Sequence, residues 1–282
     1  MEKLELKYSS NNNEEIIKRI KANEVASKLI NDLSLTDKQI IENSEMINNY
    51  IETNKCCQKC KSMKDCLAST KGHKYGLKID EIGYLTDYFT ICDYYKDYYK
   101  RKKNLTYTTF NENDVLDENQ KRFILDNPHL IGVNNIKRII KIQKDETISG
   151  LFIQMSSSKL RLQLIKSLAY NLLSNHEVSI IKFSDALKTI KSEFNSKDDT
   201  NTFKTLCDSK ILIIDGLGSE SITNWSRDDI LLSLLDNRLQ SEKITILCSE
   251  FTLDDLKKVY KLGYNDDVKV NQLIQKIKDI DS

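Results

Sequence analysis

The chain has 282 residues, with 43 Lys and Arg against 42 Asp and Glu, and its net charge is +1. This balance excludes a protein whose overall field attracts nucleic acid or membranes, so any electrostatic binding must come from local patches. Hydrophobic residues make up 39% of the chain and charged residues 30%. This composition suits a globular protein, and the length allows two domains.

The sequence predicts a cytoplasmic protein with no membrane partner. It contains no run of 18 apolar residues, and its polar, acidic start, MEKLELKYSSNNNEE, is unlike a signal peptide. The seven cysteines are therefore expected in a reducing compartment. There they should bind metal or be buried rather than form disulfides.

The first part of the chain, to about residue 54, is predicted to be helical because apolar residues recur near helical spacing. Thr36 or Ser34 is suited to cap the second of its helices. An aromatic segment, YLTDYFTICDYYKDYYK, follows a cysteine cluster, and Tyr84, Tyr88 and Ile91 have helical spacing there. The segment is interpreted as a helix that packs on the cluster, and the alternative is a surface on which bases stack.

The second part of the chain alternates helical patterns with short apolar runs, which predicts a parallel sheet in a three-layer α/β domain. The apolar runs lie at 151–155, 178–183, 211–215 and 244–249. Before them, residues 101–116 show no periodicity and are predicted to be a linker. The predicted parts are a small helical, zinc-binding domain at 1–100, the linker at 101–116 and an α/β domain at 117–282.

The cysteine cluster is the sharpest chemical signal. Cys57 and Cys60 have the C-x2-C spacing that lets two thiolates hold one zinc ion from a tight turn. Polar residues are interleaved with them, which argues against the alternative of unrelated buried cysteines. A closed site with four ligands would be structural rather than catalytic. We expect Zn²⁺ to be held by four of five candidates, Cys57, Cys60, Cys66, His73 and Cys92.

The other cysteines and two of the candidates have alternative interpretations. Cys56 is expected to be a bystander of the cluster, and Cys207 and Cys248 lie at apolar runs and are expected in the core. Cys92 is flanked by apolar residues, so a buried role stays open for it. His73 is also compatible with a surface position in a loop.

The run ILIID at 211–215 predicts a strand that ends in Asp215. Nucleotide-dependent ATPases place such a carboxylate near magnesium at the carboxyl edge of a parallel sheet. A phosphate loop needs G-x-x-x-x-G-K-[ST] after its strand, but residues 155–162 contain no glycine. In a match without gaps, Arg161 stands at the position of the Lys and Leu162 at that of the hydroxyl residue.

These residues resemble a known family. The stretch at 213–256 resembles the AAA+ core of the DnaI/DnaC family of bacterial primosomal helicase loaders, and Trp225, Arg227 and Asp228 match the middle of its pattern. The cysteine cluster resembles the family's amino-terminal C-x2-C-x5-C arrangement, with Gly72 and His73 following in order. The resemblance covers residues from about 50 to 280. It implies a P-loop-like AAA+ fold with a parallel sheet.

The resemblance also shows departures at the nucleotide site. Gly216 replaces the second acid, Glu250 stands at the sensor Asn, and residues 262–277 lack the family's two arginines. With the missing glycine loop, these changes predict a pseudo-ATPase that is not an enzyme and for which ATP is an unlikely cofactor. The predicted vestigial nucleotide site consists of Ser156, Ser157, Ser158, Lys159, Arg161, Asp215 and Glu250.

The resemblance implies a primosomal protein of DNA replication that delivers the replicative helicase hexamer to DNA, and we expect it to act without its own ATP hydrolysis. Single-stranded DNA is a candidate partner, and the basic run Lys100, Arg101, Lys102 and Lys103 is a candidate contact, unless it is only a solvated face. One alternative is a zinc-stabilised adaptor without DNA binding. Another is a loader that binds ATP through an irregular loop at residues 156–159.

Overall fold

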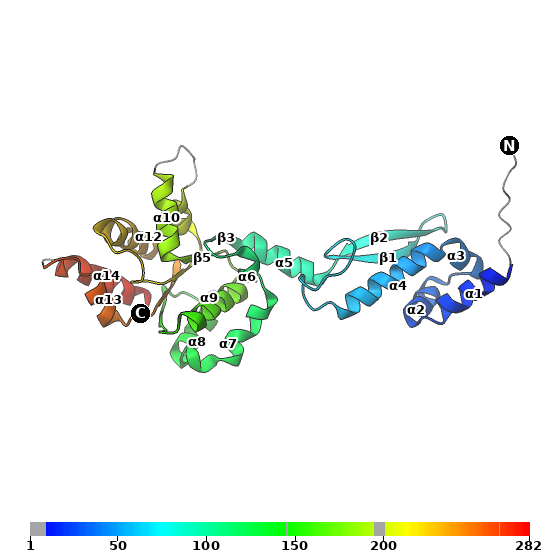
Figure 1. Cartoon of the computed structure of the whole chain (residues 1–282), viewed down its shortest axis with the longest axis horizontal. Helices are drawn as coiled ribbons and strands as arrows, with labels where there is room; N and C mark the ends of the chain where they lie inside the picture. Colours follow the sequence, from blue (N-terminus) through cyan, green and yellow to red (C-terminus); the bar gives the residue numbers. More distant parts are fainter. Residues whose placement is uncertain (1–9, 145, 195–200, 265) are drawn as a thin grey trace. The chain divides into compact units, whose positions relative to one another are not determined.

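The structure is a computed structural model that describes residues 10–144, 146–194, 201–264 and 266–282. The chain divides into two compact units, Met1–Tyr98 and Tyr99–Ser282, and Figure 1 shows the elements of each. Among the described residues, no helix is both long and apolar enough to cross a membrane.

The amino-terminal unit contains helices followed by an antiparallel hairpin, which confirms the helical prediction for the first part of the chain. Thr36 caps α3 through a capping box with Gln39, and Ser34 ends α2 in the left-handed region. These local signals fix where the helices begin and end. The elements are α1 (Ser10–Lys21), α2 (Glu24–Leu33), α3 (Asp37–Glu42), α4 (Ser44–Lys59), β1 (His73–Ile79) and β2 (Leu85–Ile91).

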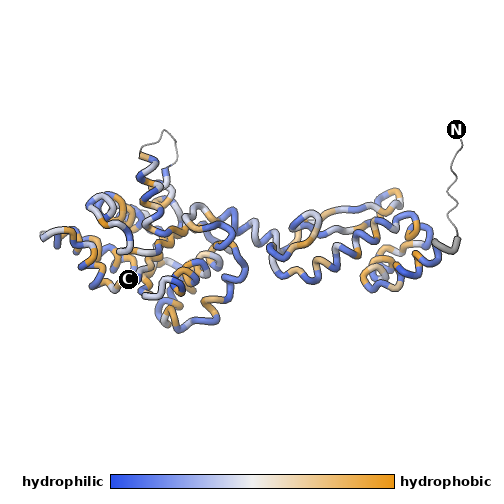
Figure 2. The backbone as a smooth tube through the Cα atoms, in the orientation of Figure 1, coloured by the Kyte–Doolittle hydropathy of each residue, from blue (hydrophilic) through white to orange (hydrophobic). Residues whose placement is uncertain are grey.

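The core of this unit lies between the helices and one face of the hairpin. Ile20, Ile40 and Ile47 from the helices are buried in one cluster with Leu77 of β1 and Leu85 of β2. Figure 2 shows hydrophobic and hydrophilic residues alternating along these helices, as amphipathic helices require.

The aromatic segment differs from its predicted helix. Residues 85–91 form β2, which pairs with β1 in the register Tyr75↔Phe89, and only after Cys92 does the helix α5 (Asp93–Asn104) begin. Thr, Phe and Ile suit the pleated surface, so cross-strand pairing outweighs the coincidental helical spacing of the tyrosines.

The carboxy-terminal unit is an α/β fold around a five-stranded parallel sheet with the order β3-β5-β6-β7-β4. All four predicted apolar runs are strands of this sheet, which confirms the sheet prediction. Nearly all residues of β4 to β7 are buried, as expected for a sheet covered on both faces. The strands are β3 (Leu105–Thr108), β4 (Gly150–Gln154), β5 (Val178–Lys182), β6 (Ile211–Asp215) and β7 (Ile244–Ser249).

Helices cover the two faces of the sheet. Phe152, Leu212 and Leu247 share a cluster with residues of the helices from α10 to α14. The alternate strand residues point to the opposite face, where α9 contacts β5 and β6. The helices are α6 (Glu112–Val115), α7 (Phe123–Asp126), α8 (Val133–Gln143), α9 (Ser158–Leu172), α10 (Phe183–Glu193), α11 (Thr202–Asp208), α12 (Ser233–Gln240), α13 (Leu253–Val259) and α14 (Asp267–Ile280), with 3-10 turns at Glu118–Arg122 and Pro128–Leu130 and a π-helix at Trp225–Leu232.

The segment at 101–116 contains regular structure where a linker is predicted. It holds the end of α5, the edge strand β3 and α6. β3 extends the sheet by pairing in parallel with β5, with Leu105 opposite Val178. A four-residue edge strand with two threonines is too short to show a period of its own, and pairing with β5 decides its structure.

Candidate functional site

The predicted metal ligands line one cavity in the amino-terminal unit. They come from four places in the chain: the end of α4, the loop after it, the first residue of β1 and the position after β2. The cavity is lined by Cys57, Cys60, Cys66, His73 and Cys92, together with Lys74, Asp93 and Tyr94. Cys56, although adjacent in sequence, is not among the lining residues.

Backbone groups hold these cysteines in place. The Cys60 N–H donates to the Cys57 carbonyl at 3.2 Å, which forms the tight turn at the end of α4. The Gly72 N–H lies 3.5 Å from Cys66 Sγ, and the Tyr95 N–H lies 3.4 Å from Cys92 Sγ. N–H donors of this kind stabilise a thiolate. The Cys92 N–H also donates to the Gly72 carbonyl at 2.9 Å.

Gly72 is required at its position for two reasons. Its φ is +77°, in the left-handed region, and a Cβ there would lie 2.2 Å from Cδ2 of Tyr95. The Tyr95 ring also packs against the His73 ring, with centroids 5.6 Å apart. A glycine is therefore needed where the loop, the hairpin and α5 meet.

The electrostatics of the cavity suit a cation. Burial raises the pKa of the Cys57 thiol and nearby Cys66 raises it further, while burial also raises the pKa of Cys60. A divalent metal would offset the repulsion between thiolates. As the side chains stand, no group of three or more His, Cys, Asp or Glu within the described residues is arranged to hold a metal ion. Thiolate and imidazole donors, which Zn²⁺ prefers, are thus gathered in one cavity.

The predicted nucleotide site lies at the carboxyl edge of the sheet in the other unit. Arg161 Nε lies 2.5 Å from Asp215 Oδ1, and Nη1 donates to the Met155 carbonyl at 2.9 Å. Both partners of the ion pair are buried. β4 ends at Gln154 and α9 begins at Ser158, so only Met155, Ser156 and Ser157 connect them.

This short connection does not form a phosphate cradle in the structure. Ser157 is the N-cap of α9 and accepts from the Leu160 N–H at 3.4 Å, while Ser158 and Lys159 follow as exposed residues of the first turn. The next strand end is tied to it, because Gln154 Nε2 donates to the Glu250 carbonyl at 3.0 Å and to Ser156 Oγ at 3.2 Å. The Glu250 carboxylate accepts from Ser219 Oγ at 3.0 Å. All seven predicted residues thus gather at this edge.

A buried network beside this edge was missed by the sequence analysis. Tyr260 OH donates to Glu220 Oε1 at 2.8 Å, and the Gly218 N–H donates to Glu220 Oε2 at 2.8 Å. Burial raises the pKa of Glu220 and of Tyr260. The Gly-Ser-Glu pattern at 218–220 was a usable signal for Glu220, whereas nothing in the sequence singles out Tyr260.

Arg227, one of the residues that carry the family resemblance, forms a buried set of ion pairs and hydrogen bonds. Arg227 is fully buried in the π-helix and contacts the Asp228 carboxylate at 2.7 and 2.9 Å. Its Nη1 also donates to Asp266 Oδ2 at 2.8 Å and to the Tyr260 carbonyl at 2.9 Å. Arg227 therefore joins the π-helix to the segment that leads into α14.

The basic run at 100–103 does not act as one patch. Arg101 is buried, donates to the Tyr170 carbonyl and lies 4.0 Å from the centroid of the Tyr170 ring. The prediction of a DNA contact is wrong for Arg101, because its side chain packs within the unit. Lys100, Lys102 and Lys103 are exposed, and Lys102 Nζ lies 3.4 Å from Glu112. Cys207 and Cys248 are buried, as predicted.

The chain is similar to the replicative helicase loader DnaI of Bacillus subtilis (strain 168), with 22% identity over 271 residues. The match spans 92% of this chain and 86% of that protein. This match supports the similarity of the chain to the DnaI/DnaC helicase loaders. This confirms the family resemblance of the sequence, although no family model matches the chain.

Several solved structures are similar to part of this chain, with TM-scores below 0.5. A crystal structure of DnaI has 18% identity and a TM-score of 0.48, and covers 64% of this chain and 93% of its own. A putative primosome component from Streptococcus pyogenes serotype M3 has 14% identity and a TM-score of 0.44, with coverages of 65% and 92%. A DnaC helicase loader has 19% identity and a TM-score of 0.43, with coverages of 57% and 96%.

Similarity to the DnaI/DnaC helicase loaders corrects one prediction. The family's members are AAA+ helicase loaders, which are ATPases, so the prediction of a pseudo-ATPase is contradicted. That prediction rested on counting motif residues that the chain lacks. The Arg161–Asp215 pair shows how this edge is built, and the residues replaced there do not establish a loss of activity.

Proposed function

We propose that this protein is a primosomal factor that binds the replicative DNA helicase hexamer and loads it onto single-stranded DNA in DNA replication. The observation that carries the proposal is the extent of the match to the helicase loader DnaI. A match that spans 92% of this chain includes residues of both units, so it is not confined to a nucleotide-binding core that many unrelated proteins share.

We further propose that the amino-terminal unit carries a structural Zn²⁺. Four of Cys57, Cys60, Cys66, His73 and Cys92 would hold it, and the shared cavity supports this choice. When bound, the ion would supply a cross-link between the end of α4 and the base of the hairpin. The N–H groups of Gly72 and Tyr95 would stabilise the thiolates of Cys66 and Cys92.

In the proposal the two units divide the work. The zinc-bearing unit contacts the helicase, and the carboxy-terminal unit acts on single-stranded DNA. The division is supported by the separate cores of the two units, which let each present its own surface.

The test is size-exclusion chromatography with light scattering on the full chain mixed with its cognate replicative helicase, with and without ATP. We expect a stable complex with the wild-type protein and its loss in the Cys57→Ser/Cys60→Ser double variant. Cys56→Ser is the matched control, because Cys56 lies on the same helix and outside the cavity. No complex of the wild-type protein under either condition would overturn the loader proposal.

A second measurement separates a loader from an adaptor that only holds proteins together. The helicase is mixed with circular single-stranded DNA to which a short complementary strand is annealed. Release of the short strand measures the unwinding activity of the helicase as the protein is added. A loader increases the amount of helicase on DNA. An adaptor forms the same complex with helicase but leaves the unwinding activity unchanged.

A further inference from the structure

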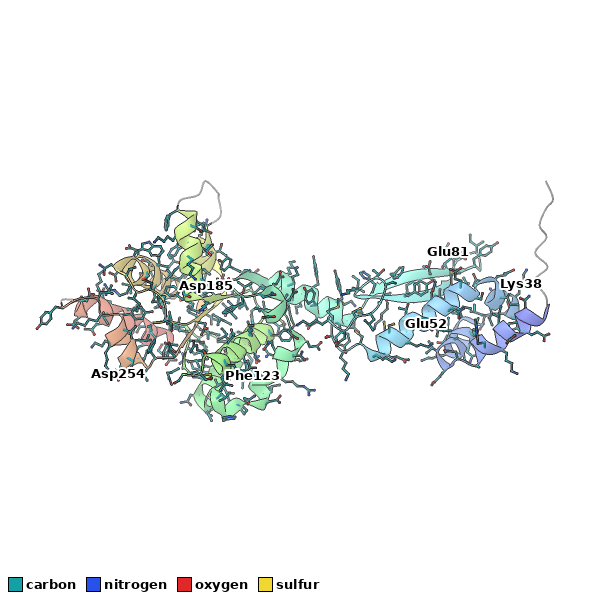
Figure 3. The ribbon with its side chains drawn as sticks, in the orientation of Figure 1. Lys38, Glu52, Glu81, Phe123, Asp185 and Asp254 are labelled. Atoms are coloured by element: carbon teal, nitrogen blue, oxygen red, sulfur yellow. The ribbon has the colours of Figure 1, made fainter. Side chains whose placement is uncertain are left out.

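The outer face of the hairpin β1–β2 carries a row of residues that lie outside the core, and of these Lys74 also lines the cysteine cavity. In the antiparallel register, Gly76 lies opposite Tyr88, Lys74 opposite Thr90 and Lys78 opposite Thr86. Residues directly opposite one another in such a pair share a face. We call this set, Lys74, Gly76, Lys78, Thr86, Tyr88 and Thr90, the outer hairpin face. Glu81, labelled in Figure 3, lies in the turn beyond it.

This face points away from the core of the unit. The alternate residues Leu77 and Leu85 are buried against the helices, and α4 packs on β1. Because side chains alternate along a strand, Gly76 and Tyr88 face the other way. Within the described residues, Lys74, Lys78, Tyr88 and Thr90 are all exposed.

The Tyr88 ring lies over Gly76 on this face. A Cβ at residue 76 would lie 2.5 Å from Tyr88 Cζ and 2.8 Å from its hydroxyl oxygen, so the ring occupies the space that a larger side chain would fill. One side of the ring thus rests on the backbone of β1. The side chain remains 40% exposed, which leaves an aromatic surface open to solvent.

Two cations flank this ring. Lys74 and Lys78 are the diagonal neighbours of Tyr88 on β1, and such neighbours lie about 7–8 Å apart across a strand pair. Lys74 Nζ is 3.9 Å from Asp93 Oδ2, but both side chains are more than half exposed, so the pair is weak. An aromatic surface between two cations fits a base stacked on the ring with phosphates on either side.

We propose that the outer hairpin face binds single-stranded nucleic acid, with Tyr88 as the stacking platform and Lys74 and Lys78 as phosphate contacts. The choice of DNA as the ligand rests on the proposed function, and this face would add a DNA contact in the amino-terminal unit to the one proposed for the carboxy-terminal unit. The face offers tyrosine, threonine and lysine side chains and lacks the large aliphatic side chains that the core of a protein interface usually needs. Its charge is complementary to a polyanion.

The test uses the full chain and an oligothymidylate. In a first experiment, 5-iodouracil replaces one base and the cross-linked peptide is identified by mass spectrometry. We expect a cross-link to Tyr88, because this photochemistry favours a stacked aromatic ring. Cross-links found only outside residues 73–91 would overturn the proposal, even if the protein binds the oligonucleotide through its other unit.

In a second experiment, fluorescence anisotropy measures affinity as a function of salt. Tyr88→Leu should weaken binding at this site by about 5- to 150-fold, whereas Tyr88→Phe should retain it. Lys74→Gln with Lys78→Gln should lower the slope of log K against log salt by about 1.4, since each phosphate contact on a single strand contributes about 0.7. Lys28→Gln, at an exposed position on α2, is the control and should change neither quantity.

The same variants are then tested for the helicase complex, which separates this inference from the proposed function. Retained helicase binding with weakened DNA binding supports the proposal. Retained helicase binding with unchanged DNA affinity and salt slope overturns it and leaves the loader function intact. Loss of the helicase complex by Tyr88→Leu with unchanged DNA binding also overturns it, because the face would then be a protein contact.

Discussion

The two units of this protein are stabilised in different ways. In the carboxy-terminal unit, a parallel sheet is buried on both faces, and buried arginines such as Arg161 and Arg227 tie its loops together. In the amino-terminal unit, the apolar core reaches Ile51 on α4, but the end of that helix enters a polar cavity lined by Cys57 and its neighbours. The comparison indicates that packing alone stabilises the carboxy-terminal unit. In the amino-terminal unit, the proposed Zn²⁺ would add a cross-link at the end where the apolar core stops.

Metal removal should give the largest effect and should affect only the amino-terminal unit. Structural zinc in small domains contributes on the order of 10 kcal/mol of apparent binding free energy at neutral pH. We expect the chelated protein to lose hydrogen-exchange protection between residues 57 and 95. The fluorescence of Trp225, the only tryptophan, should report unchanged unfolding of the other unit.

Two controls make this result specific. Cys57→Ser should lower the bound zinc measured by mass spectrometry from about one ion per chain to none. Cys56→Ser should leave it unchanged, because Cys56 does not line the cavity. Unchanged exchange protection after chelation would mean that the packing of the hairpin and α4 is sufficient by itself, and the contrast between the units would fail.

Arg227→Ala tests the stability of the carboxy-terminal unit, where buried side chains rather than a metal are expected to hold the structure. The variant removes the buried Arg227 guanidinium that joins the Asp228 and Asp266 carboxylates. Because these carboxylates are partly exposed to water, the cost should stay below the about 3–5 kcal/mol of a fully buried pair, at roughly 2–3 kcal/mol. Chemical denaturation followed by Trp225 fluorescence should show this loss, and the zinc content should not change. Arg122→Ala, at an exposed position, should stay within about 0.5 kcal/mol of the wild type.

Arg101→Ala should give an intermediate effect. Its guanidinium group lies over the Tyr170 ring and donates to the Tyr170 carbonyl, so its removal should cost about 2 kcal/mol. The neighbouring exposed residue Lys103 should be replaceable by Ala at almost no cost. If both substitutions lower the free energy of unfolding equally little, the Arg101 side chain is exposed in solution, as the sequence predicts.

The sequence predicted those parts of the fold that have a strong local pattern. The buried runs such as ILIID at 211–215 could be recognised as strands because they are continuous and apolar. β2 could not, since its tyrosines have helical spacing and only pairing with β1 shows that it is a strand. β3 was missed for a similar reason: its pairing with β5 joins residues more than 70 positions apart.

The same distinction applies to the sites. Spacing alone brought Cys57, Cys60 and Cys66 together, because short loops limit how far apart their thiols can lie. The Glu220–Tyr260 contact was not predictable, since it joins residues 40 positions apart and Tyr260 has no motif around it. The pseudo-ATPase prediction was wrong for a different reason. It was drawn from motif residues that are missing in the sequence, whereas activity depends on the groups that the folded site brings together.

The smallest predicted effect is the most direct comparison of the two units, because both contain the same helix cap. Thr36 Oγ1 accepts from the Gln39 N–H at 3.3 Å in the first unit, and Thr252 Oγ1 accepts from the Asp255 N–H at 3.2 Å in the second. Replacing either threonine by Ala should cost about 1 kcal/mol. The cost should appear in the Trp225 transition only for Thr252→Ala.

The two substitutions should diverge once metal is removed. The proposed zinc cross-link should supply much of the stability of the amino-terminal unit. In chelator, Thr36→Ala should therefore lose the helical circular dichroism that this unit contributes. Thr252→Ala should respond to chelator as the wild-type protein does. The reason is that a loss of about 1 kcal/mol is a large fraction of a small free energy of unfolding, as expected for the metal-free amino-terminal unit. It is a minor part of the larger free energy of unfolding expected for the carboxy-terminal unit. Equal responses of the two variants to chelator would show that the two units have similar free energies of unfolding without metal.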